Sequence, residues 1–165
     1  LSAHKKGWDE RWEEFSTWAE KGKAYHDELL RLVDEDTRAY NAIVDAFRLP
    51  KNSEEEKQKR TEVIQTATRY AMEVPFKVMQ TSYDSMTVIL EMAEKGNPNS
   101  VSDAGVGALA ARSAVLGAGM NVRINSKDLL DRVFVEEILK KVSEIEQKTI
   151  ELEAKIIEIV RQKTT

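Results

Sequence analysis

Apolar residues recur every three or four positions along most of the chain, which is the spacing of a helix that buries one face. No segment alternates apolar and polar residues at every second position, as a half-buried strand does. The pattern therefore predicts an all-α protein, an antiparallel bundle of long helices that forms one domain over residues 1–165. The four helices are expected over about 8–47, from 53 to about 73 and resuming after Pro75 to 95, over 102–125, and from 128 to the C-terminal end.

Capping residues and helix breakers mark the expected boundaries. Ser53 followed by Glu56 is a capping box, which indicates a helix start. Pro75 is expected to break or kink the second helix, and Gly96 to end it. Ser102 is a good N-cap for the third helix.

The last helix carries an apolar seam with the heptad spacing of a helix that packs along its whole length. Its one gap is filled by Thr149. The apolar members are Ile138, Val142, Ile145, Leu152, Ile156 and Ile159.

One face of the first helix is apolar and contains a single carboxylate. At about 100° per residue, Asp36 falls in the middle of this face, whereas Asp34 points nearly the opposite way. Burial raises the pKa of an unpaired carboxyl toward the range useful for proton transfer, so Asp36 is a candidate general acid/base. The alternative is a structural role, in which Asp36 caps a helix end or pairs with a buried cation. The apolar members of the face are Tyr25, Leu29, Leu32, Val33, Tyr40, Ile43, Val44 and Phe47.

The third helix has a stripe of small residues with a carboxylate at its head and amides at its tail. Such a stripe favours either close contact with another helix or a slot for a flat ligand, and the sequence leaves both open. At about 1.5 Å per residue, Asp103 and Asn121 lie about 27 Å apart, too far to serve one reacting atom. The stripe consists of Asp103, Gly107, Ala110, Ala114, Gly117, Ala118, Asn121 and Asn125.

Composition narrows the classes of partner. The net charge is -4, so nucleic acid is not expected to bind. Arg112 and Arg123 interrupt the apolar run of the third helix, which argues against a membrane span. His4 and His26 are too few and too scattered for a metal site. Cysteine is absent, which removes disulfides and thiolate chemistry, and no signal peptide is visible, so a cytoplasmic protein is expected.

Two segments together carry a family resemblance. "LVDEDTRAYNAIVDAFRLPK" (32–51) and "GNPNSVSDAGVGALAARSAVLGAGMNVRIN" (96–125) resemble the cyclodeaminase/cyclohydrolase family, which comprises the C-terminal half of formiminotransferase-cyclodeaminase and its stand-alone relatives. The family domain normally opens with a glycine- and alanine-rich helix upstream of the first residue here. This chain is therefore expected to be a piece of a longer polypeptide.

The resemblance implies a dimeric, all-helical enzyme that acts on folate. The expected reaction closes 5-formiminotetrahydrofolate to 5,10-methenyltetrahydrofolate with loss of ammonia, without a metal or redox cofactor. Asp36 matches the family position expected to act as acid/base. The resemblance also makes substrate or framework contacts of Asp103, Asn121 and Asn125, and Lys5 and Lys6 match a basic pair that could hold the anionic substrate.

Three functions remain open at this point. The chain could be the cyclodeaminase of a bifunctional enzyme with a fused formiminotransferase domain, in histidine degradation. It could instead be a methenyltetrahydrofolate cyclohydrolase, in which water attacks the same carbon. The third possibility is a non-catalytic helical module that serves dimerisation.

Overall fold

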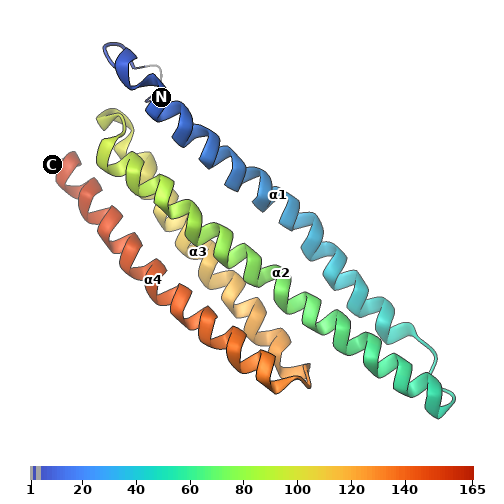
Figure 1. Ribbon diagram of the computed structural model, residues 1–165. Coiled ribbons are helices and arrows are strands. Elements are labelled where there is room, and N and C mark those ends of the chain that lie inside the picture. Colours follow the sequence, from blue (N-terminus) through green and yellow to red (C-terminus); the bar gives the residue numbers. More distant parts are fainter. Residues whose placement is uncertain (1, 3–4) are drawn as a thin grey trace.

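The computed structural model describes residues 2 and 5–165, so His4 lies outside the described part. It contains four long α-helices that form one elongated antiparallel bundle (Figure 1). No strand occurs in the described residues, and the all-α prediction is confirmed. The helices are α1 (Trp12–Arg48), α2 (Glu54–Lys95), α3 (Val101–Asn125) and α4 (Arg132–Thr164), with one-turn helices η1 (Asp9–Arg11), η2 (Pro98–Ser100) and η3 (Ser126–Asp128).

The central element is α2, which contacts each of the other three helices, whereas α1 packs mainly along α2. Figure 1 accordingly shows α1 at one side of the bundle, with α3 and α4 on the other side of α2. None of the described helices is both long and apolar enough to cross a bilayer.

Helix boundaries follow the local signals with two corrections. The capping box of Ser53 and Glu56 opens α2 as predicted. Ser102 is not the N-cap of α3, because the one-turn helix η2 leads directly into Val101. Likewise, α4 begins later than predicted, because residues 126–128 form a separate turn and Asp131 caps the helix by accepting a hydrogen bond from the Phe134 amide.

Pro75 does not break α2, which is helical from residue 54 to residue 95. Proline has no amide hydrogen, so the carbonyl of Ala71, four residues earlier, has no donor within the helix. The side-chain amide of Asn125 donates to this carbonyl at 2.8 Å. The end of α3 therefore satisfies the backbone group that Pro75 leaves free in α2.

The main core lies between α2, α3 and α4 and follows the predicted seam of α4. Val142 and Ile156 are fully buried, and Ile138 is nearly so. Thr149 is also fully buried, and its hydroxyl donates to the Ile145 carbonyl at 2.7 Å, which satisfies the one polar group in the seam. Burial of this apolar surface is the chief stabilising contribution of the three-helix part.

Small residues on the inner face of α3 allow its neighbours to come close. At Gly119, an added Cβ would lie 2.5 Å from a carboxylate oxygen of Glu146. That carboxylate accepts two hydrogen bonds from Arg123, at 2.5 and 2.6 Å. The glycine thus leaves room for an ion pair between α3 and α4 against the backbone of α3.

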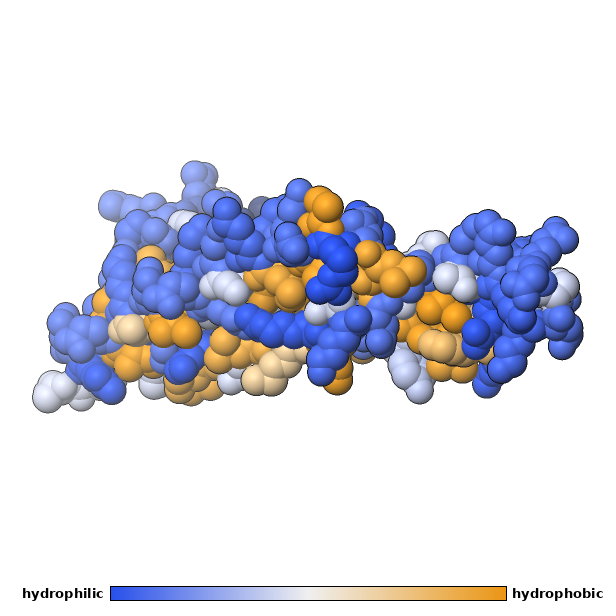
Figure 2. Space-filling model, turned by 90° about the horizontal axis from the view of Figure 1, so that it is seen from below, coloured by the Kyte–Doolittle hydropathy of each residue, from blue (hydrophilic) through white to orange (hydrophobic). Residues whose placement is uncertain are grey.

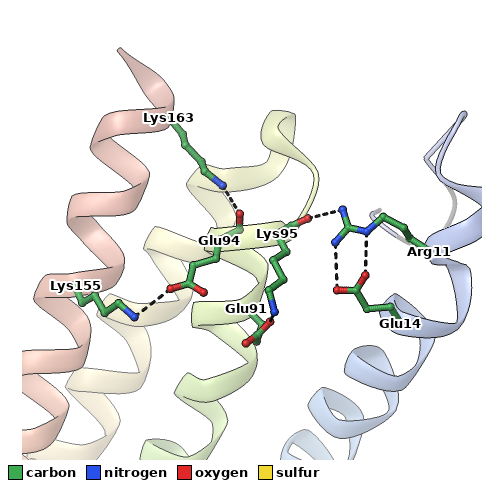
Figure 3. Close-up of polar contacts among 7 residues, drawn as sticks. All are labelled: Arg11, Glu14, Glu91, Glu94, Lys95, Lys155 and Lys163. Carbon is green, nitrogen blue, oxygen red and sulfur yellow. Dashed lines mark hydrogen bonds and ion pairs between the residues drawn. The ribbon is translucent and has the colours of Figure 1, made fainter.

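The first and last helical segments meet the C-terminal end of α2 at one end of the bundle, through ion pairs and hydrogen bonds (Figure 3). Arg11 donates to the Lys95 carbonyl at 3.3 Å, and Lys163 donates to the carbonyls of Ala93 and Glu94 at 2.7 and 2.6 Å. These carbonyls lack partners within α2, and cations suit the negative end of a helix. The contacts hold the end of η1 and the end of α4 at the same end of α2.

The bond between Asn125 and Ala71 predicts a conditional effect on stability. We expect Asn125→Ala to lower the free energy of unfolding by about 1–3 kcal/mol, because it leaves the Ala71 carbonyl without a donor. In a Pro75→Ala background, residue 75 supplies an amide hydrogen and the same substitution should cost much less. Urea unfolding of the four proteins measures this coupling, and equal costs in both backgrounds would refute the assignment.

Candidate functional site

Asp36 is exposed, so the prediction that it faces the core of the single chain is wrong. The buried positions of α1 are Phe15, Leu32, Glu35, Ala39 and Ala46. The two alanines allow α1 to lie close to α2, and the helix is rotated so that these small residues face inward. Bulky residues of the predicted face are left outside as a result, including Val33 at 62%, Tyr40 at 66% and Phe47 at 56% exposed.

Glu35 is the carboxylate that faces α2, and it is only 8% exposed. It pairs with Arg31 one turn earlier in α1 and lies 3.6 Å from the ammonium of Lys77 in α2. Burial would raise the pKa of Glu35, but the Arg31 hydrogen bond and the Lys77 charge outweigh it and lower the pKa below its ordinary value. The pKa of the neighbouring Tyr70 is raised, chiefly by burial and further by the negative charge of Glu35.

The structure brings Asp36, Asn121 and Asn125 to the same level of the bundle. On one side of α2, Glu35 lies next to Lys77, and Asp36 is the next residue of α1. On the other side, Asn125 bonds to Ala71, and Gly119 lies against Met79, so Asn121 is level with Pro75. The three side chains therefore flank a stretch of α2 about 9 Å long, residues 71–77. We call residues 71–77 of α2, together with the three side chains at their level, the Pro75 layer.

Asp103 lies elsewhere, at the rim of a groove between the start of α1 and the end of α2. The groove has a volume of about 370 Å³ and is mainly apolar, with Trp18, Met92 and Asn97 among the residues that line it. Because 18 residues of α3 separate Asp103 from Asn121, this groove lies about 27 Å from the Pro75 layer. The predicted site residues thus divide into two separate places.

Lys5 and Lys6 lie near the chain start and do not line the groove. The Lys5 ammonium lies 4.2 Å from the centre of the Trp8 ring, and Lys6 is exposed. This ring contact is a cation–π interaction that holds Lys5 locally. The pair belongs to the same end of the bundle as Asp103.

The small-residue stripe of α3 is mostly open to solvent. Ala110, Ala114 and Gly117 are exposed, and an added Cβ at Gly117 would meet nothing within 4 Å. Large apolar residues of the same helix are exposed beside the stripe, among them Val106, Leu109, Met120 and Ile124. A space-filling view shows apolar residues in an uneven band between hydrophilic ones along one face of the molecule (Figure 2). Both α1 and α3 therefore present apolar surface that this single chain does not cover.

The chemistry available at the Pro75 layer is proton transfer and hydrogen bonding. Asp36 offers an accessible carboxylate, Asn121 an exposed amide, and Asn125 an amide whose nitrogen is already bonded to Ala71. Within residues 2 and 5–165, no three histidine, aspartate or glutamate side chains are grouped so that they could hold a metal ion.

Glu35 was missed by reasoning from the sequence, although a signal was present. Leu32, Glu35, Ala39 and Ala46 are separated by three, four and seven residues, which is the spacing of a close-packed helix seam. Two of the four are alanines, and a search for bulky apolar residues passes over them. The contact with α2 is centred on Leu32 and the alanines, and the predicted apolar face lies partly to one side of it.

Comparisons with known proteins agree with the fold. A sequence model of the family described as formiminotransferase-cyclodeaminase matches residues 1–144. The crystal structure of a formiminotetrahydrofolate cyclodeaminase from Thermotoga maritima superposes with a TM-score of 0.83 at 24% identity, covering 99% of this chain and 78% of that one. This likeness shows a shared fold.

Two curated relatives have different names. A methenyltetrahydrofolate cyclohydrolase of Methylorubrum extorquens is 35% identical over 144 residues, which are 87% of this chain and 69% of that protein. A formimidoyltransferase-cyclodeaminase of Rattus norvegicus is 40% identical over 118 residues, 72% of this chain. The matched region is only 22% of the rat protein's length.

The lowered pKa of Glu35 predicts how acid affects stability. A carboxyl whose pKa is lowered on folding stabilises the protein above its unfolded pKa, and this contribution is lost as the pH falls through the folded value. We expect Glu35→Gln to lower the free energy of unfolding by about 1–3 kcal/mol at pH 7. The difference from the parent should shrink as the pH falls below about 4.5, the ordinary value for glutamate. Asp34→Asn, at an exposed position of the same helix, is the control for urea unfolding across this pH range, and a difference independent of pH would contradict the assignment.

Proposed function

The chain belongs to the formiminotransferase-cyclodeaminase family, and we propose that it is a formimidoyltetrahydrofolate cyclodeaminase. In this proposal it closes 5-formiminotetrahydrofolate to 5,10-methenyltetrahydrofolate and releases ammonia, a lyase reaction of one-carbon metabolism and histidine degradation. The single observation that carries the assignment of the site is the Pro75 layer, where an accessible carboxylate and two amides flank the same part of α2.

Asp36 is the proposed general acid/base. N10 of the protonated substrate attacks the formimino carbon, which forms the new C–N bond and leaves a proton on N10. The carboxylate of Asp36 takes this proton and gives it to the former imino nitrogen. The bond between that nitrogen and the carbon then breaks, ammonia leaves, and the methenyl cation remains. One carboxyl group thus serves both proton transfers.

The amides and the remote residues take supporting parts. Asn121 is proposed to hydrogen-bond the folate, and Asn125, which is tied to Ala71, supports the wall of the site. Asp103, Lys5 and Lys6 are proposed to contact a part of the substrate remote from the reacting carbon, since Asp103 lies about 27 Å from Asn121. The substrate is a tetrahydrofolate derivative, and no separate cofactor is part of the proposal.

A second copy of the chain is proposed to complete the site. Asp36 shares its face of α1 with the exposed Val33, Tyr40 and Phe47. A homodimer that covers this face would remove water from around Asp36, which strengthens electrostatic interactions with the reacting atoms. The proposed setting is cytoplasmic, with a formiminotransferase domain fused to the same chain as in the rat relative's name.

The competing function is that of a methenyltetrahydrofolate cyclohydrolase. The bacterial relative that bears this name matches 87% of this chain, which is the observation in its favour. In that reaction Asp36 would take a proton from the water that attacks the methenyl carbon. The same carboxylate therefore serves either proposal, and only the substrate differs.

The proposal predicts that replacing Asp36 lowers turnover, whereas replacing Asp34 does not. We expect Asp36→Asn to lower kcat for 5-formiminotetrahydrofolate by about 100-fold or more, because it removes the acid/base. Asp34→Asn should leave kcat within about twofold, since this exposed side chain is not in the proposed mechanism. The assay follows methenyltetrahydrofolate in the full-length protein, with circular dichroism as the check on folding.

The same assay separates the alternatives. Activity with methenyltetrahydrofolate alone would favour the cyclohydrolase. A folded parent that is inactive with both folates would favour a non-catalytic dimerisation module. Full activity of Asp36→Asn would show that the chemistry lies elsewhere.

A further inference from the structure

We propose that Glu35 is a positioning residue: its contact with Lys77 sets the rotation of α1 on α2 and so keeps Asp36 at the open surface, level with Asn121. The effect on turnover rests on the proposed function, whereas the effect on the position of Asp36 does not. Glu35 touches no reacting atom in this account. It acts through the helix that carries the next residue.

The apolar contacts between α1 and α2 combine large and small residues. Leu32 is fully buried, and Leu29 and Ile43 pack against the same cluster. Ala39 and Ala46 each contribute a single methyl group to the interface with α2.

The larger Val33 and Tyr40 lie outside, and a rotation that buried them would gain apolar burial. The same rotation would turn Leu32 away from α2, so the two arrangements exchange one set of buried apolar side chains for another. A directional interaction adds to the preference for the observed rotation.

The contact between Glu35 and Lys77 is such an interaction. In the part of the chain that the structure describes, polar contacts join η1 and α1 to α2 at both ends of the interface and in its middle. Arg11 bonds to the Lys95 carbonyl at one end, and Arg60 bonds to the Phe47 carbonyl at the other. Between these ends, Glu35 lies 3.6 Å from Lys77. Glu35 keeps its Arg31 partner in any rotation because both are on α1, but only the observed rotation also brings this buried carboxylate to Lys77 of α2.

Rotation matters because Asp36 follows Glu35 directly. Successive side chains of a helix point about 100° apart, so the direction of Glu35 fixes the direction of Asp36. With Glu35 toward Lys77, Asp36 is exposed at the level of Asn121. If α1 turned to bury Val33 and Tyr40, Asp36 would move toward α2 and away from the open surface.

The test measures the position of residue 36 directly. Residues 1–165 contain no cysteine, so Asp36→Cys and Asn121→Cys add two attachment points for spin labels to this part of the protein, and any cysteine outside it is replaced by serine first. Pulsed electron paramagnetic resonance gives the distribution of distances between them in the full-length protein. Doubly labelled protein is diluted with unlabelled protein, so that distances between two chains of a homodimer do not contribute. We expect one narrow distribution within the chain in this background, and a shifted or broadened one after Glu35→Gln or Lys77→Met.

Glu28→Gln is the matched control. Glu28 also pairs with Arg31, at 2.7 Å, but this contact lies within α1. Its removal should leave the distance distribution unchanged. An unchanged distribution in both Glu35→Gln and Lys77→Met would overturn the proposal, and so would an equal change in the Glu28 control.

Turnover is measured in proteins without labels or cysteines, at a temperature at which circular dichroism shows every variant folded. Glu35→Gln is expected to lower kcat about 10-fold or more with KM within about twofold, because misplacement of a catalytic group acts mainly on the chemical step. An unchanged kcat together with a shifted distance would overturn the link to catalysis. A parent inactive with both folates would refute the proposed function, and the distance measurement would still decide the role of Glu35.

Discussion

The missing amide hydrogen of Pro75 is the constraint around which the middle of the bundle is arranged. It leaves the Ala71 carbonyl without a donor inside α2, and Asn125 at the end of α3 supplies one. This bond fixes how far α3 extends along α2. Lys77 lies six residues after Ala71 in α2, and it forms an ion pair with Glu35 of α1. Two polar contacts within a short stretch of α2 therefore set the relative positions of three helices, and the candidate catalytic layer lies between them.

The division of small and large residues explains why that layer is open. Several alanines and glycines of α1 and α3 are buried beside a few larger residues, which brings the helices close to their neighbours, and other bulky apolar residues of both helices are exposed. Exposed apolar surface of this kind is typical of a contact with another surface. The Asp36 carboxylate lies within it, so the proposed chemistry and the proposed homodimer depend on the same face of α1. A catalytic carboxylate at such an interface would be desolvated only in the assembled protein.

Much of the fold follows from the sequence because its signals are local or strictly periodic. The capping box at Ser53 and the seam of α4 with Thr149 at its gap depend on residues a few positions apart, and both were predicted. The rotation of α1 was not, because the bulk of side chains on a helical wheel does not show that alanines form the contact. Because the rotation was predicted wrongly, Asp36 was expected to face inward, whereas the buried carboxylate is that of Glu35. The continuity of α2 through Pro75 was also missed, because the compensating donor, Asn125, is 50 residues further along the chain.

The most direct test of the account is to find where a folate binds. 5-Formyltetrahydrofolate resembles the proposed substrate but has no amine to expel, so hydrogen exchange followed by mass spectrometry can be measured with it bound to the full-length protein. The account predicts slower amide exchange in residues 29–40 and 117–125, which flank the Pro75 layer. Slower exchange confined to residues 15–22 and 88–104, around the groove at Asp103, would contradict it.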